Sequence, residues 1–88
     1  MAKNFQVVFL PRAVRSLDKI PPPTRARLIR AAESLGANPI PPGVNKLQGS
    51  EFHRMRVRDY CIVYEVKGTV LLVTVIRIGT RGEVYRGL

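Results

Sequence analysis

An alternating pattern in the second half of the chain constrains its fold most, because it runs over residues 52–66 with one break at Arg58-Asp59. Successive side chains of a β-strand point to opposite faces of a sheet. The pattern therefore predicts two antiparallel strands joined by a tight turn, with Arg54, Arg56 and Arg58 projecting from one side. Three neighbouring cations repel each other unless a polyanion neutralises them, so the pattern points to a phosphate-bearing partner.

The other elements are predicted from apolar runs, helical spacing and the prolines and glycines that separate them. They are a buried strand over 5–10, a helix from Pro11 with Val14, Leu17 and Ile20 on one face, a helix over 24–35, a loop over 37–50, and a strand over 70–78 after a turn at Lys67-Gly68. In the second helix, Leu28, Ala32 and Leu35 share one face.

Two-residue loops at both turns would fix the register of the last three strands. The predicted pairs are Arg54 with Val63, Arg56 with Cys61, Val63 with Leu72, and Cys61 with Thr74. The opposite face would then be apolar, with Met55, Val57, Tyr60, Ile62, Tyr64, Leu71, Val73 and Val75. We therefore predict an α+β fold in which two N-terminal helices pack on one face of a small, mostly antiparallel sheet, in a single domain over 1–88.

The amino-acid composition limits the classes of partner and cofactor that suit this chain. The 88 residues carry a formal charge of +9, which favours RNA, DNA or an acidic protein over a neutral ligand. One cysteine and one histidine exclude an internal disulfide and make a zinc or haem centre improbable, so we expect no metal and no cofactor. The first residues lack the apolar core of a secretory signal, and no apolar run is long enough to span a membrane. We expect a cytoplasmic protein.

Few side chains are candidates for chemistry. Arg54 and Arg56 bind phosphate but are always protonated, so they cannot act as a base; the alternative is a solvated arginine face or a docking patch. Tyr85 follows Arg81 by four residues. It is either a packing residue or, with arginines around it, a phenol of lowered pKa.

Three other titratable residues are weaker candidates. His53 falls on the opposite face from the arginines and is expected to be partly packed. Glu65 shares the arginine face but lies near the far turn, where an ion pair is expected. Cys61 would lie on the basic face as a thiol of lowered pKa, but it has no placed histidine partner.

Five segments along the chain form a recognisable series. They are Pro-Arg-Ala-Val-Arg-Ser-Leu-Asp-Lys-Ile-Pro, Gly-Val-Asn-Lys-Leu-Gln-Gly, His-Arg-Met-Arg-Val-Arg-Asp-Tyr, Ile-Val-Tyr-Glu-Val and Arg-Ile-Gly-Thr-Arg-Gly-Glu-Val-Tyr-Arg. In their order and spacing they resemble the RelE/ParE superfamily of toxin–antitoxin toxins over nearly the whole chain. The resemblance implies two helices on a mostly antiparallel sheet. It further implies, for the RelE-like branch, a metal-independent endoribonuclease that cleaves translated mRNA in the ribosomal A site.

By similarity, the catalytic residues would be Arg54, Arg56, Arg81 and Tyr85. Tyr85 would take the proton of the 2′-hydroxyl, Arg81 and Arg56 would hold the phosphate, and Arg54 would steer the backbone near the leaving 5′-oxygen. We also expect Arg58, Lys46 and Arg77 to bind RNA. The implied partners are a cognate antitoxin, the ribosome and mRNA, and operator DNA only through the toxin–antitoxin complex, with no membrane.

One position departs from the RelE pattern. RelE-type toxins usually carry an arginine immediately after the tyrosine of the third strand, and here that residue is Cys61. Loss of one phosphate contact lowers a rate by ~10²–10³ on the scale of a deleted oxyanion donor. Two alternatives stay open: a ParE-like toxin that inhibits gyrase without nuclease chemistry, and a weakly active or inactive homologue that only binds RNA.

Overall fold

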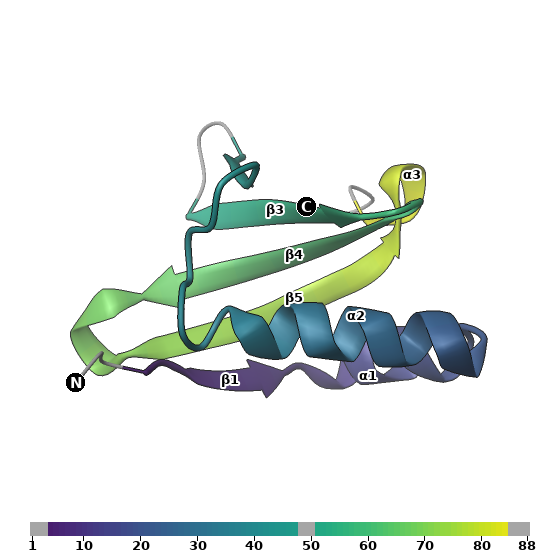
Figure 1. The fold of residues 1–88 in the computed structure, drawn as a ribbon, viewed down its shortest axis with the longest axis horizontal. Helices are drawn as coiled ribbons and strands as arrows, with labels where there is room; N and C mark the ends of the chain where they lie inside the picture. The colour runs from purple at the N-terminus through teal and green to yellow at the C-terminus, as the bar shows by residue number, and fades with distance from the viewer. Residues whose placement is uncertain (1–3, 48–50, 85–88) are drawn as a thin grey trace.

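Helices α1 and α2 lie along one face of a twisted sheet in the computed structural model, which describes residues 4–47 and 51–84 (Figure 1). The elements are β1 (Gln6–Phe9), α1 (Pro11–Asp18), α2 (Pro22–Ser34), β2 (Asn45–Lys46), β3 (Phe52–Val57), β4 (Tyr60–Lys67), η1 (Gly68–Val70), β5 (Leu72–Thr80) and α3 (Arg81–Val84). In the described residues the strand order is β1-β5-β4-β3-β2, with β1 parallel to β5 and all other pairs antiparallel. The predicted α+β fold is confirmed.

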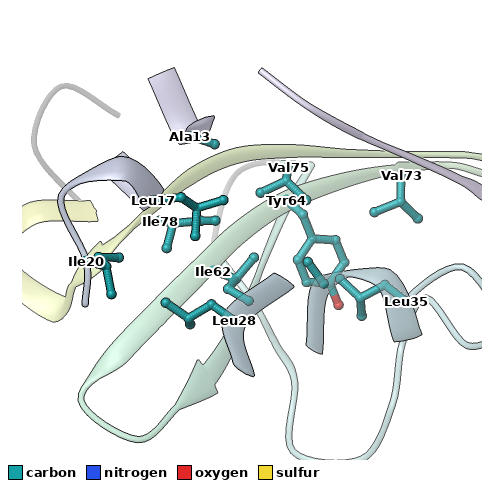
Figure 2. Close-up of a cluster of buried hydrophobic side chains, with 11 residues drawn as sticks. Ala13, Leu17, Ile20, Leu28, Leu35, Ile62, Tyr64, Val73, Val75 and Ile78 are labelled. Carbon is teal, nitrogen blue, oxygen red and sulfur yellow. The ribbon is translucent and has the colours of Figure 1, made fainter. Parts of the chain in front are cut away.

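The sheet face that α1 and α2 cover, here called the back face, holds the larger apolar core (Figure 2). Leu28 and Ala32 of α2, and Leu35 at its C-terminal cap, are fully buried against it, as their spacing predicted. Tyr64 of β4 lies in the same core, and its hydroxyl donates a hydrogen bond of 2.7 Å to the Pro39 carbonyl oxygen. Burial raises the pKa of Tyr64 to about 12, which suits a structural phenol.

The inward side of α1 differs from the prediction. Ala13, Leu17 and Ile20 are buried, whereas Val14 is 44% exposed. Residues 13, 17 and 20 follow each other at the i, i+4, i+7 spacing of one helical stripe, and Val14 lies about 100° further round the helix. The predicted inward position of Val14 is therefore wrong, and the alanine before it is buried instead.

The two hairpins gave different outcomes. Arg58-Asp59 is a two-residue turn that pairs Val57 with Tyr60, so the predicted partners of Arg54 and Arg56 are confirmed. The second turn is longer than predicted. Lys67 at the end of β4 pairs with Leu72 at the start of β5, and the turn between them consists of η1 and Leu71, which has a φ of 52°.

The predicted pairing of β4 with β5 is therefore wrong. Besides the longer turn, a register shift between Val63 and Tyr64 moves the partners by a further residue. Cys61 lies opposite Gly79 instead of Thr74, and Val63 opposite Arg77 instead of Leu72. Leu71, predicted on the apolar face, lies in the turn.

Three smaller differences complete the fold. β2 lies within the segment predicted as a loop, and the short helix α3 was not predicted. β1 is an edge strand whose residues are half-buried or exposed, not a buried strand. No helix in the described parts of the chain is long and apolar enough to cross a membrane.

Candidate functional site

Two rows of residues cross the face of the sheet opposite α1 and α2, here called the front face. One row is Arg54, Val63 and Arg77, and the other is Arg56, Cys61 and Gly79, read across β3, β4 and β5. Neighbouring strands lie about 5 Å apart, so the backbones of Arg54 and Arg77 are about 10 Å apart. The corrected register thus brings Arg77 into line with the predicted phosphate-binding arginines.

Arg81 is the first residue of α3 and follows Gly79, the β5 member of the second row, by two residues along the chain. Its side chain is exposed. α3 lies at the end of β5 beside the turn between β3 and β4 (Figure 1). β3 places Arg54 and Arg56 on the front face, and Arg81 begins α3, whose Val84 packs on that face. That these three arginines act on one phosphate stays a prediction.

Thr80 and Glu83 fix the start of α3. The backbone N–H and the hydroxyl of Thr80 both donate hydrogen bonds to Glu83 Oε1, at 2.9 and 2.7 Å. A threonine before the first helical turn, with a glutamate three residues later, is a capping arrangement that satisfies donors at a helix start. Gly79 permits the close approach, because a Cβ atom there would lie 3.3 Å from Glu83 Cβ.

The centre of the front face is apolar. Val84 of α3 packs on Cys61 and Val63, and Phe52 and Leu47 border this cluster. Cys61 lies on the front face opposite Arg56, as predicted, but it is only 2% exposed, so its thiol is covered by the apolar cluster. The position that usually carries an arginine in RelE-type toxins is thus filled here by a small side chain beneath α3.

The turn between β3 and β4 carries a third arginine. Arg58 has a φ of 55°, in the left-handed region, and it lies in the turn beyond the end of β3. It therefore does not continue the alternation of Arg54 and Arg56 along that strand, contrary to the prediction. Arg56 is exposed, and its Nε donates a long hydrogen bond of 3.4 Å to the Arg58 carbonyl oxygen. Arg58 therefore flanks the second row at the rim of the sheet.

Lys46 is placed away from the arginine rows. It pairs in register with His53, which has back-face parity, whereas its neighbour Asn45 pairs with Arg54. His53 stacks on Tyr64 with 5.5 Å between ring centroids, as expected of a packed residue outside the site. Burial, followed by the charge of Lys46, lowers the pKa of His53.

Glu65 makes the predicted ion pair, with Lys67 at 3.9 Å.

Tyr85 lies outside the described residues, so its predicted role stays a prediction. Val84, the residue before it, is buried on the front face. Sequence reasoning overlooked Thr80 and Glu83, although the spacing Thr-x-x-Glu at Thr80-Arg81-Gly82-Glu83 was a usable signal.

Comparison with known proteins now identifies the family. The sequence model described as the ParE toxin of type II toxin–antitoxin systems matches residues 7–85. The chain belongs to the RelE/ParE superfamily of toxins. None of the curated protein sequences compared with this toxin matches it significantly.

Solved RelE structures share the fold of this RelE/ParE-superfamily toxin. The toxin–antitoxin complex RelBE2 from Mycobacterium tuberculosis matches with a TM-score of 0.82 and 23% identity, covering 92% of this chain and 95% of that chain. The isolated Escherichia coli RelE toxin matches with a TM-score of 0.74 and 29% identity, covering 93% and 90%. The intact E. coli RelBE complex matches with a TM-score of 0.74 and 26% identity, covering 88% and 95%.

Proposed function

We propose that this toxin is a ribosome-dependent, metal-independent endoribonuclease that cleaves translated mRNA in the A site. The observation that carries the proposal is the set of front-face arginines, Arg54 and Arg77 in the first row and Arg56 in the second, with Arg81 two residues after Gly79. RNA supplies its own nucleophile, the 2′-hydroxyl, so an enzyme needs only to align it, transfer protons and stabilise charge. Arginines arranged around one phosphate serve two of these three needs.

Each residue has a separate task in this mechanism. Tyr85 takes the proton of the 2′-hydroxyl, which attacks the adjacent phosphorus. Arg81 and Arg56 donate hydrogen bonds to the phosphate as its charge rises in the transition state. Arg54 steers the backbone near the 5′-oxygen. As the bond from the 2′-oxygen to phosphorus forms, the bond from phosphorus to the 5′-oxygen breaks, and the 5′-oxygen keeps the electron pair and takes a proton from water. The products are a 2′,3′-cyclic phosphate and a 5′-hydroxyl.

The ribosome supplies part of the orientation in this proposal, and free RNA is a poor substrate. Arg77 and Arg58 border the two rows and contribute charge that holds the message. Lys46, with its back-face parity, contributes to a different part of the surface. The protein acts in the cytoplasm, where translated mRNA is found.

An antitoxin is the proposed protein partner. The intact E. coli RelBE structure is a toxin–antitoxin complex, and its toxin chain shares this fold. An antitoxin segment with acidic residues would neutralise part of the +9 charge of this chain. Operator DNA is bound only through the toxin–antitoxin complex in this proposal.

A second candidate is inhibition of DNA gyrase without nuclease chemistry. It is favoured by the family match, which is to ParE toxins, and by Cys61 at a position where RelE-type toxins usually carry an arginine. The two candidate functions predict different products, since only the nuclease cuts an RNA strand.

Primer extension on a message translated in a reconstituted system tests the proposal. Wild type is expected to cut inside codons, and Arg81→Ala and Tyr85→Phe to reduce cutting by ~10²–10³. Arg27→Ala, an exposed arginine of α2, is the matched control and is expected to cut normally. Absence of cuts by wild type, together with inhibited DNA supercoiling by gyrase, would establish the second candidate instead.

A further inference from the structure

A groove of about 370 Å³ runs along the end of β5, beyond the point where β1 stops. β1 pairs with β5 only as far as Val75. Beyond Val75, the edge of β5 that faces away from β4 has no neighbouring strand in the part of the chain that the structure describes, and α1 contacts β5 instead. α1 forms one wall of the groove with Arg12, Ser16 and Lys19, and the start of α3 forms another. The groove is thus continuous with the segment that holds Arg81.

The charge of this groove is positive. Arg12, Lys19 and Arg77 line it, against one carboxylate, Glu83. Glu83 Oε1 already accepts two hydrogen bonds from Thr80. Arg12 and Lys19 are exposed, and neither makes a salt bridge within the described ranges 4–47 and 51–84. Two cations on the same wall of a groove, neither of them in a salt bridge among the described residues, favour an anionic ligand.

The remaining lining indicates which anion. The groove contains the hydroxyl-bearing residues Ser16, Thr80 and Tyr60. The Thr80 hydroxyl already donates to Glu83, which leaves the hydroxyls of Ser16 and Tyr60 as donors to phosphate oxygens. An aromatic ring beside a cationic groove is the combination with which proteins bind single-stranded nucleic acid. An acidic peptide would pair with the cations, but it has no bases to stack on the half-buried ring of Tyr60.

We propose that this groove binds the phosphate backbone of single-stranded RNA, as a site separate from the front-face arginines. Arg12 and Lys19 each contact a phosphate, and Arg77, which belongs both to the first arginine row and to the groove wall, connects the two sites. The inference rests on the proposed function for the identity of the RNA as the message that is cut. It assigns Arg12, Ser16 and Lys19 of α1 a role in holding that message.

The test measures binding without cleavage. The probe is a short single-stranded oligonucleotide with methylated 2′-hydroxyls, which removes the nucleophile. The double variant Arg12→Gln/Lys19→Gln is expected to bind about tenfold or more weakly, as loss of hydrogen bonds to charged groups implies. The slope of log affinity against log salt should fall by about 1.4, because each phosphate contact on single strands contributes about 0.7.

The matched control is Arg27→Gln/Arg30→Gln, which removes the same charge from exposed positions of α2 that do not line the groove. It should lose clearly less affinity and slope than the groove variant. Amide resonances of Ser16, Gly79 and Thr80 should also shift when the oligonucleotide is added to wild type. Equal losses in both double variants, or resonance shifts that avoid the groove, would overturn the proposal.

Two further outcomes separate this inference from its alternatives. If the groove variant binds the oligonucleotide normally but binds the antitoxin weakly, the groove is a protein site and the RNA inference is wrong. If wild type binds the oligonucleotide through the groove but never cuts a translated message, the nuclease proposal fails while the RNA site stands. Normal message cutting with unchanged RNA binding in the groove variant removes the RNA site alone.

Discussion

The back and front faces of the sheet differ in what their buried side chains stabilise. On the back face, Leu28, Ile62 and Tyr64 belong to a large apolar cluster under two helices. On the front face, Cys61, Val63 and Val84 form a small cluster under the four-residue helix α3. Burial of apolar surface contributes about 25 cal/mol per Å², so the larger cluster supplies most of the stability.

This separation leaves the front face free for charge. Arginines next to the large core would lose hydration, which is costly for a charged group without a partner. On the front face they border a small cluster and stay partly or fully exposed. Substitutions on the two faces should therefore affect different measurements. Those on the back face should lower the free energy of unfolding, and those on the front face should lower RNA cleavage.

Leu28→Ala should have the largest effect on stability. Leu28 is fully buried between α2 and the sheet, and loss of a buried leucine side chain costs about 2–5 kcal/mol. Denaturant unfolding followed by circular dichroism measures the change. Val14→Ala, on the exposed side of α1, should change stability by less than about 0.5 kcal/mol. Similar losses in both variants would show that the back core does not dominate.

Cys61→Arg tests the front cluster. An arginine would restore the residue type usual in RelE-type toxins, but the Cys61 side chain is nearly inaccessible beneath Val84. We expect a loss of about 1–3 kcal/mol from overpacking, together with displacement of α3 and no gain in cleavage. Cys61→Val, which keeps the site apolar, should cost less than about 1.5 kcal/mol. A stable Cys61→Arg protein with faster cleavage would contradict a closed apolar centre.

The sequence predicted the back face better than the front because helix α2, which covers the back face, is long enough to show helical periodicity, whereas α3 on the front face has four residues. Leu28, Ala32 and Leu35 repeat at helical spacing, and the first hairpin has a two-residue turn that fixes its register. Most residues of β5 are apolar, including Leu72, Val73, Val75, Ile76 and Ile78, so a shift of its register leaves the pattern almost unchanged. The longer second turn was therefore invisible, and with it the row that joins Arg54 to Arg77.

The site was predictable only in part for the same physical reason. Arg54 and Arg56 follow from strand alternation, whereas the position of Arg81 depends on α3, which is too short to show helical periodicity. Its capping residues Thr80 and Glu83 were the one local signal. The burial of Cys61 depends on Val84, more than twenty residues away in the chain, and no local pattern reports such a contact.

Glu83→Ala should have a moderate effect on the front face. It removes the acceptor of both Thr80 hydrogen bonds, and loss of such a cap costs about 1 kcal/mol. If α3 positions Arg81, mRNA cleavage should fall about fivefold, the factor that corresponds to this energy. Glu83→Gln keeps an oxygen acceptor and should recover most of the activity.

The control for this capping contact is Glu33→Ala, an exposed carboxylate of α2. It changes the net charge equally and should leave cleavage unchanged. Hydrogen exchange at the Thr80 amide should accelerate in Glu83→Ala and not in Glu33→Ala. If Glu83→Gln is as impaired as Glu83→Ala, the charge of Glu83 and not its hydrogen bonds would matter.

The smallest expected effect is a pH dependence of stability that arises at His53, on the back-face side. Burial first, and then the charge of Lys46, lowers its pKa from the ordinary value of 6.5, while Glu51 acts in the opposite direction. Its Nδ1 is buried without a hydrogen-bond partner among the described residues, so protonation of the ring gains no compensating contact. The unfolded chain therefore binds a proton more readily than the folded one.

Because the unfolded state takes up more protons, stability should be complete above pH 6.5 and should fall as the pH drops toward the lowered pKa of His53. Melting temperatures across this window measure the slope. His53→Phe keeps an aromatic ring against Tyr64 but cannot titrate, so its profile should be flatter. Lys46→Gln removes one cause of the lowered pKa and should reduce the slope without abolishing it, since burial is the larger cause. An unchanged slope in His53→Phe would show that the acid sensitivity arises elsewhere in the chain.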